Sequence, residues 1–233
     1  MRVALVSMHT SPAAVPGSED AGGMNVVISE AARALAERGH EVVAVTRATA
    51  ELPPGEHPFA VDRRSTAAPP TAAATAPAAS APVLVALAAG DPALRKGELP
   101  AAVPEFAAGL RALGPFDAVH AHYWLSGVAA RAAFERPFAM SFHTLAAQKN
   151  AHLAPGDAPE PEARVAAERG LAASSFVVAG SHSELAAIER YCGPLLLGSE
   201  VVHPGVDTEL FAPRGAPSLH RAPSPHRTPS PSK

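Results

Sequence analysis

A glycine-rich segment near the start of the chain has the residue types that bind a phosphate. His9 follows a short apolar run, and Asp20-Ala21-Gly22-Gly23-Met24-Asn25 opens a predicted helix. The two glycines let the backbone approach a ligand closely, and the unpaired N–H groups and positive dipole end of a helix attract an anion. The segment therefore predicts an anion site. The alternative is a plain strand-to-helix turn in which Asp20 or Asn25 satisfies local backbone groups.

The same segment disfavours two common kinds of nucleotide site. It has neither the G-x-G-x-x-G pattern of a dinucleotide site nor the lysine of a P-loop. A plain doubly wound nucleotide-binding protein is therefore the weakest interpretation of the chain.

Three histidines fall at the ends of two predicted strands. His120 and His122 belong to the run His120-Ala121-His122-Tyr123-Trp124, and alternation along a strand puts them on the same face. His143 ends the next predicted strand. A zinc site is one interpretation, although no acidic or cysteine ligand stands at metal-site spacing. Hydrogen bonding to the hydroxyls of a sugar or polyol is the other, and His, Tyr and Thr suit it.

Two cations are candidates for binding a phosphate. Arg164 follows the segments His143-Thr144-Leu145 and Lys149-Asn150, and Lys96 lies in a polar loop. A guanidinium at the edge of a crevice can pair with a phosphate through two N–H groups. Considered singly, each of these side chains is more typical of a solvated surface charge.

The elements that position these residues alternate between apolar strands and amphipathic helices. A helix follows Gly22-Gly23, with Met24, Val27, Ile28, Ala31 and Leu35 on one face, and Gly39 ends it. Ser181 is the expected N-cap of the last helix. Strands are predicted over residues 3–7, 41–46, 83–88, 118–121, 138–142, 176–179 and 200–202, and helices over 102–113, 125–134, 162–173 and 183–191. The alternation predicts a doubly wound α/β fold with a parallel sheet, whose ligands bind beyond the carboxyl ends of the strands.

Composition sets the broad class of the protein. The chain has 233 residues, of which 47% are hydrophobic, and its formal net charge is −3. The near balance of charges excludes a nucleic-acid binder that depends on a global positive field. The apolar run at the N-terminus is too short for a signal peptide, and no run is long enough to span a membrane. With one cysteine, Cys192, no internal disulfide can form, so we expect a cytoplasmic protein.

Two segments have compositions that do not build a core. Residues 65–82 contain only Ala, Pro, Thr and Ser, which predicts a disordered insertion. Residues 212–233 end in a basic Ser/Pro-rich sequence, which predicts a disordered tail. We therefore expect one folded domain over residues 1–211.

The motifs taken together resemble a known enzyme family. They comprise His9-Thr10-Ser11-Pro12, Pro16-Gly17, the segment from Asp20 to Val26, His120 to Gly127, His143 to Ala146, Lys149-Asn150, Pro161 to Arg164, and His203-Pro204-Gly205-Val206-Asp207. In order and spacing, from about residue 2 to residue 212, they resemble the N-terminal half of the retaining GT-B glycosyltransferases. The resemblance is greatest to the inositol-phosphate glycosyltransferases of mycothiol biosynthesis in actinobacteria.

This resemblance implies a reaction and a set of roles. Such enzymes transfer N-acetylglucosamine from UDP-N-acetylglucosamine to a hydroxyl of 1D-myo-inositol 3-phosphate, and the leaving diphosphate helps to deprotonate the acceptor. No cofactor or metal is implied. His9 and Gly23 would reach the donor, and His143 would contact a sugar hydroxyl or support a residue that does. The implied acceptor site comprises Asp20, Ala21, Gly22, Gly23, Met24, Asn25, Lys96, Tyr123, Thr144 and Arg164.

The chain also departs from the family pattern. Val15-Pro16 stands where the family has Gln-Pro, so an amide that touches the donor is missing, and the insertion at 65–82 replaces a shorter connection. The sequence ends soon after Asp207, before the second domain that binds the nucleotide sugar. We therefore expect an acceptor-binding domain that needs a separately encoded donor domain for catalysis. The alternatives are a non-catalytic module that binds a sugar phosphate or inositol phosphate, and a truncated relic.

Overall fold

The computed structural model describes residues 1–15, 17, 21–59, 81–206, 208 and 211. Contacts divide the chain into Met1–His203 and Pro204–Lys233, and every described helix and strand lies in the first unit. The predicted insertion at 65–82 lies outside the described residues apart from Ala81 and Pro82, and the predicted tail at 212–233 lies outside them entirely. Among the described residues, no helix has the length and apolar character needed to cross a bilayer.

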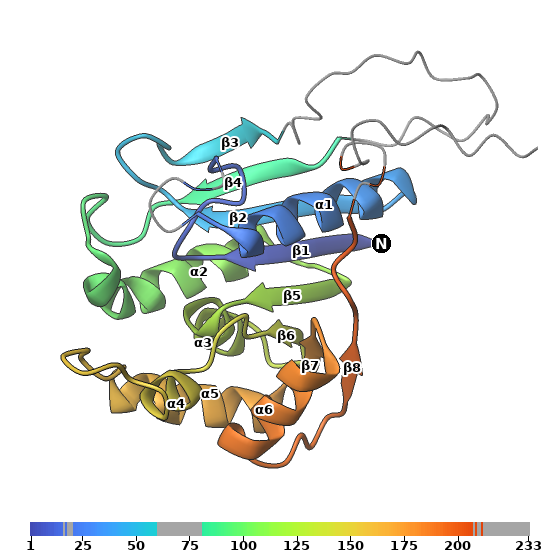
Figure 1. Cartoon of the computed structure of the whole chain (residues 1–233). Helices are drawn as coiled ribbons and strands as arrows, with labels where there is room; N and C mark the ends of the chain where they lie inside the picture. The colour runs from blue at the N-terminus through green and yellow to red at the C-terminus, as the bar shows by residue number, and fades with distance from the viewer. Residues whose placement is uncertain (16, 18–20, 60–80, 207, 209–210, 212–233) are drawn as a thin grey trace, which may run out of the picture. The chain divides into compact units, whose positions relative to one another are not determined.

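The described strands form one eight-stranded sheet with the order β3-β4-β2-β1-β5-β6-β7-β8, which can be followed in Figure 1 from β3 at one edge to β8 at the other. All neighbours pair in parallel except β3 and β4, which are antiparallel. The strands are β1 (Arg2–Ser7), β2 (Glu41–Arg47), β3 (Gly55–Pro58), β4 (Val83–Leu87), β5 (Ala118–His122), β6 (Ala139–Ser141), β7 (Phe176–Ala179) and β8 (Ser199–Val201). The predicted α/β class and parallel sheet are confirmed.

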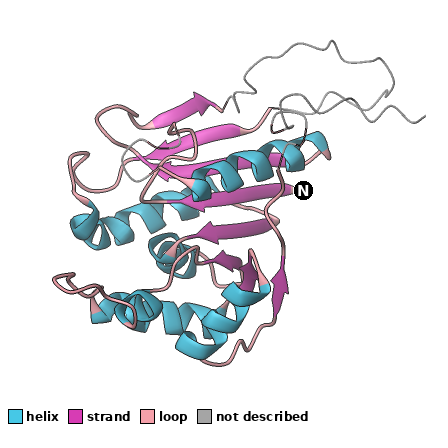
Figure 2. Ribbon diagram, viewed as in Figure 1, coloured by secondary structure: helices cyan, strands magenta, loops and turns pink. Residues whose placement is uncertain are grey.

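Helices connect these strands and cover both faces of the sheet (Figure 2). They are α1 (Gly23–Glu37), the 3-10 helix η1 (Lys96–Ala102), α2 (Val103–Leu113), α3 (Trp124–Ala133), α4 (Ala146–Asn150), α5 (Glu162–Ser174) and α6 (His182–Cys192). The predicted caps are confirmed: Gly39 follows α1 with a φ of +84°, and the Ser181 hydroxyl accepts a hydrogen bond from the Glu184 N–H. β3, η1 and α4 were not predicted from the sequence.

Alternate residues of β1 belong to two hydrophobic clusters, one on each face of the sheet. Val3 and Leu5 pack with α1, whereas Ala4 and Val6 pack in the larger cluster that contains Phe106 of α2 and Leu125 of α3. A central strand buried on both faces explains why its sequence is a continuous apolar run.

The buried face of α1 differs from the predicted one. The fully buried residues are Asn25, Ile28, Ala32 and Ala36, while the predicted Met24, Ala31 and Leu35 are only partly buried beside them. Small alanines on the central line let the helix lie close to the sheet, and the longer side chains then pack at its flanks.

Candidate functional site

Two predicted site residues meet between β1 and β5, where the strand order of the sheet reverses. His9 follows β1 and Tyr123 follows β5, which lies beside β1, and the next strands leave in opposite directions from this pair. The His9 and Tyr123 rings lie with their centroids 4.1 Å apart and their planes at 35°. The loops after β1 and β5 lie at the carboxyl edge of the strands, so these residues occupy the switch point at which ligands of doubly wound folds bind.

The backbone at Tyr123 is strained. Its φ is 72°, which non-glycine residues rarely adopt, and its N–H donates to the carbonyl oxygen of Ser141 at 2.9 Å. The turn starts α3 immediately and directs the nearly buried Tyr123 ring towards His9. Such backbone outliers cost on the order of 1–3 kcal/mol and cluster at functional sites.

Arg164 contacts two other residues of the predicted acceptor site, Tyr123 and Thr144. Its guanidinium lies 4.8 Å from the Tyr123 ring centroid, and its Nη2 donates to the Thr144 hydroxyl at 3.0 Å. The side chain is only 4% exposed, so the expectation of a solvated surface charge is wrong for Arg164. Tyr123, Thr144 and Arg164 come from three separate segments of the chain, and the fold brings them into direct contact.

Two carboxylates hold the same guanidinium. Arg164 Nε donates to Glu168 Oε1 at 2.7 Å, and Nη1 donates to Glu160 Oε2 at 2.8 Å. Burial raises the pKa of Glu168. Burial lowers the pKa of Arg164, but the hydrogen bond and charge of Glu168, together with the charges of Tyr123 and Glu160, outweigh it and raise that pKa. The guanidinium is therefore charged and fixed in place. We call Tyr123, Thr144, Glu160, Arg164 and Glu168 the arginine cluster.

Further polar contacts fix the carboxylates of the arginine cluster. The other oxygen of Glu168 accepts the N–H of Ala146, the first residue of α4, at 2.7 Å. Glu160 forms an ion pair with Lys149, and Asn150 bonds both the N–H and the carbonyl of Glu160. Burial raises the pKa of Glu160, but the nearby Lys149 and Arg164 outweigh it and lower the pKa. The segment after Thr144 is thus tied to α5 at several points.

In the glycine-rich segment, Asn25 has the structural role predicted as the alternative, because it satisfies local backbone groups. Asn25 is buried, its Oδ1 accepts the Gly22 N–H at 3.1 Å, and its Nδ2 donates to the Ser11 carbonyl at 2.6 Å. The amide therefore ties the loop after β1 to the start of α1. Gly22 and Gly23 are different, because a Cβ added to either would have no described atom within 4 Å. No described atom fills the space beside these two glycines.

The other members of the predicted acceptor site lie around this helix start. Ala21 is buried, Met24 is partly buried against both hydrophobic clusters, and Asp20 lies outside the described residues. Lys96 is exposed at the first position of η1, in the connection that leaves the carboxyl end of β4.

The three histidines lie together, and the predicted shared face of His120 and His122 on β5 is confirmed. The rings of His120 and His122 have centroids 4.1 Å apart, and those of His122 and His143 are 5.3 Å apart. His120 Nε2 lies 3.0 Å from Ser141 Oγ, and His122 Nδ1 lies 3.0 Å from His143 Nε2. We call these three residues the histidine stack.

The electrostatics of the histidine stack favour neutral rings. Burial lowers the pKa of His120 to about 4, with a further contribution from His143, and burial also lowers the pKa of His143 to about 4. The pKa of His122 is lowered well below its usual value by burial and by its two neighbours. Among the described residues, no group of three or more His, Cys, Asp or Glu is arranged to hold a metal ion. The contacts of the stack are hydrogen bonds, which suits the polar interpretation of these histidines.

Comparison with known proteins decides the family. The sequence model of Glycosyltransferase Family 4 matches residues 21–210. The chain belongs to this family.

The relatives of this glycosyltransferase chain are longer than it is. It is 42% identical to the D-inositol 3-phosphate glycosyltransferase of Xylanimonas cellulosilytica over 222 residues, which cover 91% of this chain and 49% of that protein. The enzyme of the same name from Streptomyces coelicolor is 41% identical over 91% of this chain and 45% of its own length. The chain thus spans about half the length of the curated relatives it matches.

A solved structure supports the same assignment. Sucrose-phosphate synthase from Thermosynechococcus elongatus superposes with a TM-score of 0.71 and 26% identity, covering 91% of this chain and 50% of that chain. This likeness confirms the expected GT-B class, of which the chain represents one Rossmann-like half.

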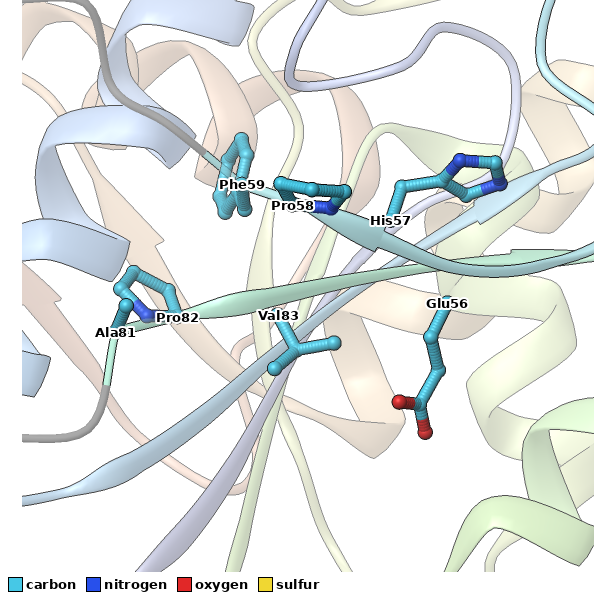
Figure 3. A pocket seen from close by; sticks show the side chains of 7 residues that line it. All are labelled: Glu56, His57, Pro58, Phe59, Ala81, Pro82 and Val83. Carbon is cyan, nitrogen blue, oxygen red and sulfur yellow. The ribbon is translucent and has the colours of Figure 1, made fainter.

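A pocket among the described residues of the glycosyltransferase chain lies away from the predicted site. Its volume is about 460 Å³, and Figure 3 shows its lining side chains at the end of β3 and the start of β4: Glu56, His57, Pro58, Phe59, Ala81, Pro82 and Val83. Because β4 runs parallel to β2, its first residue lies at the amino edge of the parallel strands, opposite the arginine cluster.

Sequence reasoning missed two residues that the arginine cluster depends on. Glu168 stands four residues after Arg164 on α5, a spacing that puts side chains together on a helix, and Glu160 stands four residues before Arg164, just ahead of the N-cap Pro161. That spacing was readable in the sequence. The burial of Arg164 and Glu168 could not be predicted, because the composition of a helix does not show which of its polar side chains face the core.

Proposed function

We propose that this chain is the acceptor-binding half of a retaining glycosyltransferase that transfers N-acetylglucosamine from UDP-N-acetylglucosamine to 1D-myo-inositol 3-phosphate. The observation that carries the proposal is the direct contact of Tyr123, Thr144 and Arg164, with the His9 ring on Tyr123. The loops that follow the neighbouring strands β1 and β5, and the distant helix α5, all contribute residues to this site. It lies at the edge where such folds bind ligands.

The contacts of Arg164 limit how it meets a phosphate. Four hydrogen bonds run from its N–H groups to Glu168, Glu160 and Thr144, so one of its five N–H donors has no acceptor among the described residues. We propose that the phosphate binds to this donor and to the exposed Thr144 hydroxyl. Glu160 and Glu168 neutralise much of the local charge, and the exposed Lys96 would supply further positive charge.

The remaining groups orient the acceptor. The open backbone at Gly22 and Gly23 would accommodate the inositol ring or its phosphate at the start of α1. In the transfer, the bond from the sugar anomeric carbon to the diphosphate breaks and a bond to the inositol oxygen forms. The departing diphosphate takes the hydroxyl proton, so this half need not provide a carboxylate base. We propose no metal and no cofactor for the reaction.

We propose that the donor-binding groups come from a second domain, either further along a longer chain or separately encoded. The relatives are about twice as long as the matched region, which supports this division. We also propose a cytoplasmic location. Cys192 is a free thiol, which suits a reducing compartment.

Calorimetric titration with 1D-myo-inositol 3-phosphate tests the acceptor site. Lys96→Ala and Thr144→Val change exposed side chains and are expected to weaken binding about 10-fold or more, as loss of a hydrogen bond to a charged group does. Arg169→Ala is the matched control, because Arg169 is an exposed cation on α5 and is expected to leave binding unchanged. Free myo-inositol should bind far more weakly than its phosphate.

Two outcomes would contradict the acceptor role. One is a folded chain that does not bind the inositol phosphate. The other is equal affinity of the wild type, Lys96→Ala and Thr144→Val. A chain that binds but transfers no sugar when the donor half of the Xylanimonas relative is supplied would instead be a binding module.

A further inference from the structure

The hydrogen bonds of the histidine stack fix where the ring protons lie. The Ser141 hydroxyl donates its single hydrogen to the Val178 carbonyl at 2.8 Å, so towards His120 it can only accept. His120 Nε2, at 3.0 Å from the same oxygen, must therefore carry a proton. A neutral His120 is consequently the Nε2–H tautomer.

His122 has one nitrogen bonded and one without a partner. Its Nδ1 lies 3.0 Å from His143 Nε2, while its Nε2 is buried with no hydrogen-bond partner among the described residues. A buried N–H without an acceptor is rarer and more costly in proteins than a buried acceptor without a donor. The protonless nitrogen of His122 is therefore Nε2, and Nδ1–H donates to His143.

This assignment decides the state of the third ring. His143 Nε2 accepts from His122, so the one proton of a neutral His143 lies on Nδ1. No hydrogen bond of His143 Nδ1 to a described residue is present, and this nitrogen is not among the buried polar atoms without partners. It is therefore open at the surface. The backbone of His143, with a φ of 62°, directs the ring from the end of β6, next to Thr144 of the arginine cluster.

We propose that His122 is a positioning residue that holds His143 as the Nδ1–H tautomer, so that His143 presents a hydrogen-bond donor to an oxygen atom of a bound sugar or inositol. Burial, which lowers the pKa of His120 and His143 to about 4, keeps one proton per ring at neutral pH. The identity of the ligand rests on the proposed function. The tautomers do not, because they follow from contacts within the chain.

Long-range ¹⁵N–¹H correlation NMR of the full chain at pH 7 measures the tautomers directly. We expect the Nδ1–H pattern for His143 and the Nε2–H pattern for His120. His122→Phe keeps a ring in the stack, and because it removes a buried nitrogen without a partner, it is expected to fold. In this variant His143 should change to the Nε2–H form that free neutral histidine favours. His122→Asn, whose amide N–H can replace Nδ1–H, should restore the Nδ1–H form.

The His120 signal is an internal control, because its bond to Ser141 should keep the Nε2–H pattern in all three proteins. The proposal is overturned if wild-type His143 shows the Nε2–H pattern, or if His143 keeps Nδ1–H in His122→Phe while the His120 signal is unchanged.

Addition of 1D-myo-inositol 3-phosphate or UDP-N-acetylglucosamine tests the donor role. A shift of the His143 Nδ1 resonance on saturation supports it. No shift in a chain that binds both ligands by calorimetry overturns the donor role. No binding of either ligand counts against the proposed function and leaves the tautomer assignment standing.

Discussion

The buried ion pair of Arg164 and Glu168 links the candidate site to the stability of the chain. Glu168 holds both the guanidinium and the first N–H of α4, and its side chain is 1% exposed. Removing one member of a buried pair leaves the other charge without its partner, which destabilises a protein by about 3–5 kcal/mol. We therefore expect Glu168→Ala to lower the free energy of unfolding in urea by about 3 kcal/mol.

The matched control for this variant is Glu189→Ala. Glu189 is an exposed glutamate on α6, and its replacement is expected to change stability by less than about 0.5 kcal/mol. Equal stability of the two variants would show that the Arg164–Glu168 contact does not contribute as described.

The histidine stack predicts how stability depends on pH. The pKa of His120 and His143 is about 4 in the folded chain against 6.5 for a free histidine, so between these values the unfolded chain binds protons that the folded chain does not. The stabilisation is complete above pH 6.5 and is lost as the pH falls towards 4. From pH 7 to pH 5, urea unfolding should show a loss of about 2 kcal/mol for each of these histidines.

Variants separate this effect from other titrating groups. His122→Phe removes one of the three buried titratable rings of the stack, so it should lose less stability between pH 7 and pH 5 than the wild type. His152→Asn replaces an exposed histidine and should follow the wild type. Stability that is flat over this range in the wild type would contradict the burial of the stack.

The sequence predicted that His120 and His122 share one face, but not how the site residues bond. Alternation was enough to put His120 and His122 on one face, because strand geometry depends only on sequence position. The bond from His122 to His143 depends on how β5 and β6 pair in register, which no local pattern specifies. Asn25 likewise had two possible roles, and only the folded loop after β1 provided its partners.

At the scale of elements, long periodic segments were predictable and short ones were not. β3 was missed because Gly55–Pro58 lacks an apolar alternation and pairs antiparallel at the end of the described sheet. α4 has five residues, too few for a helical period to appear, and η1 contains Pro100. Each of these elements takes its conformation from its neighbours more than from its own sequence.

The packing of α3 predicts a sensitive glycine. A Cβ at Gly127 would lie 2.8 Å from both Leu171 Cδ1 and Met140 Sδ, atoms of the buried core between α3, α5 and β6. Overpacking of this kind costs about 1–3 kcal/mol, which exceeds the gain of about 1 kcal/mol from replacing a helical glycine by alanine. Gly127→Ala should therefore lower the free energy of unfolding.

A second helical glycine is the control for Gly127. A Cβ at Gly170 in α5 would meet only Arg131 Nη1, the far end of a flexible and exposed side chain. Gly170→Ala should therefore leave stability unchanged or raise it by up to about 1 kcal/mol. The same sign of change in both variants, measured by urea unfolding, would contradict this account of α3 packing.

At the scale of the whole molecule, the chain spans about half the length of its relatives, and its described core lies in one unit. Both described hydrophobic clusters lie within Met1–His203, from Val3 to Ile188. The candidate site residues among the described part of the chain belong to the same unit. Folding and acceptor binding should therefore be properties of this unit alone, whereas sugar transfer is expected to need the donor-binding half.

Truncation tests where the folded unit ends. A chain that stops at His203 keeps β8 and the hydrogen bonds from Val202 N–H to Ala179 and from His203 Nδ1 to the Gly180 carbonyl. We expect its free energy of unfolding in urea to stay within about 0.5 kcal/mol of the full chain. A chain that stops at Gly198 loses β8 and its ladder with β7, which removes several backbone hydrogen bonds worth about 1 kcal/mol each. The shorter chain should thus be less stable by about 2 kcal/mol or more. If stopping at His203 destabilised the chain as much as stopping at Gly198, residues beyond His203 would have to contribute to the core, and the described unit would be incomplete.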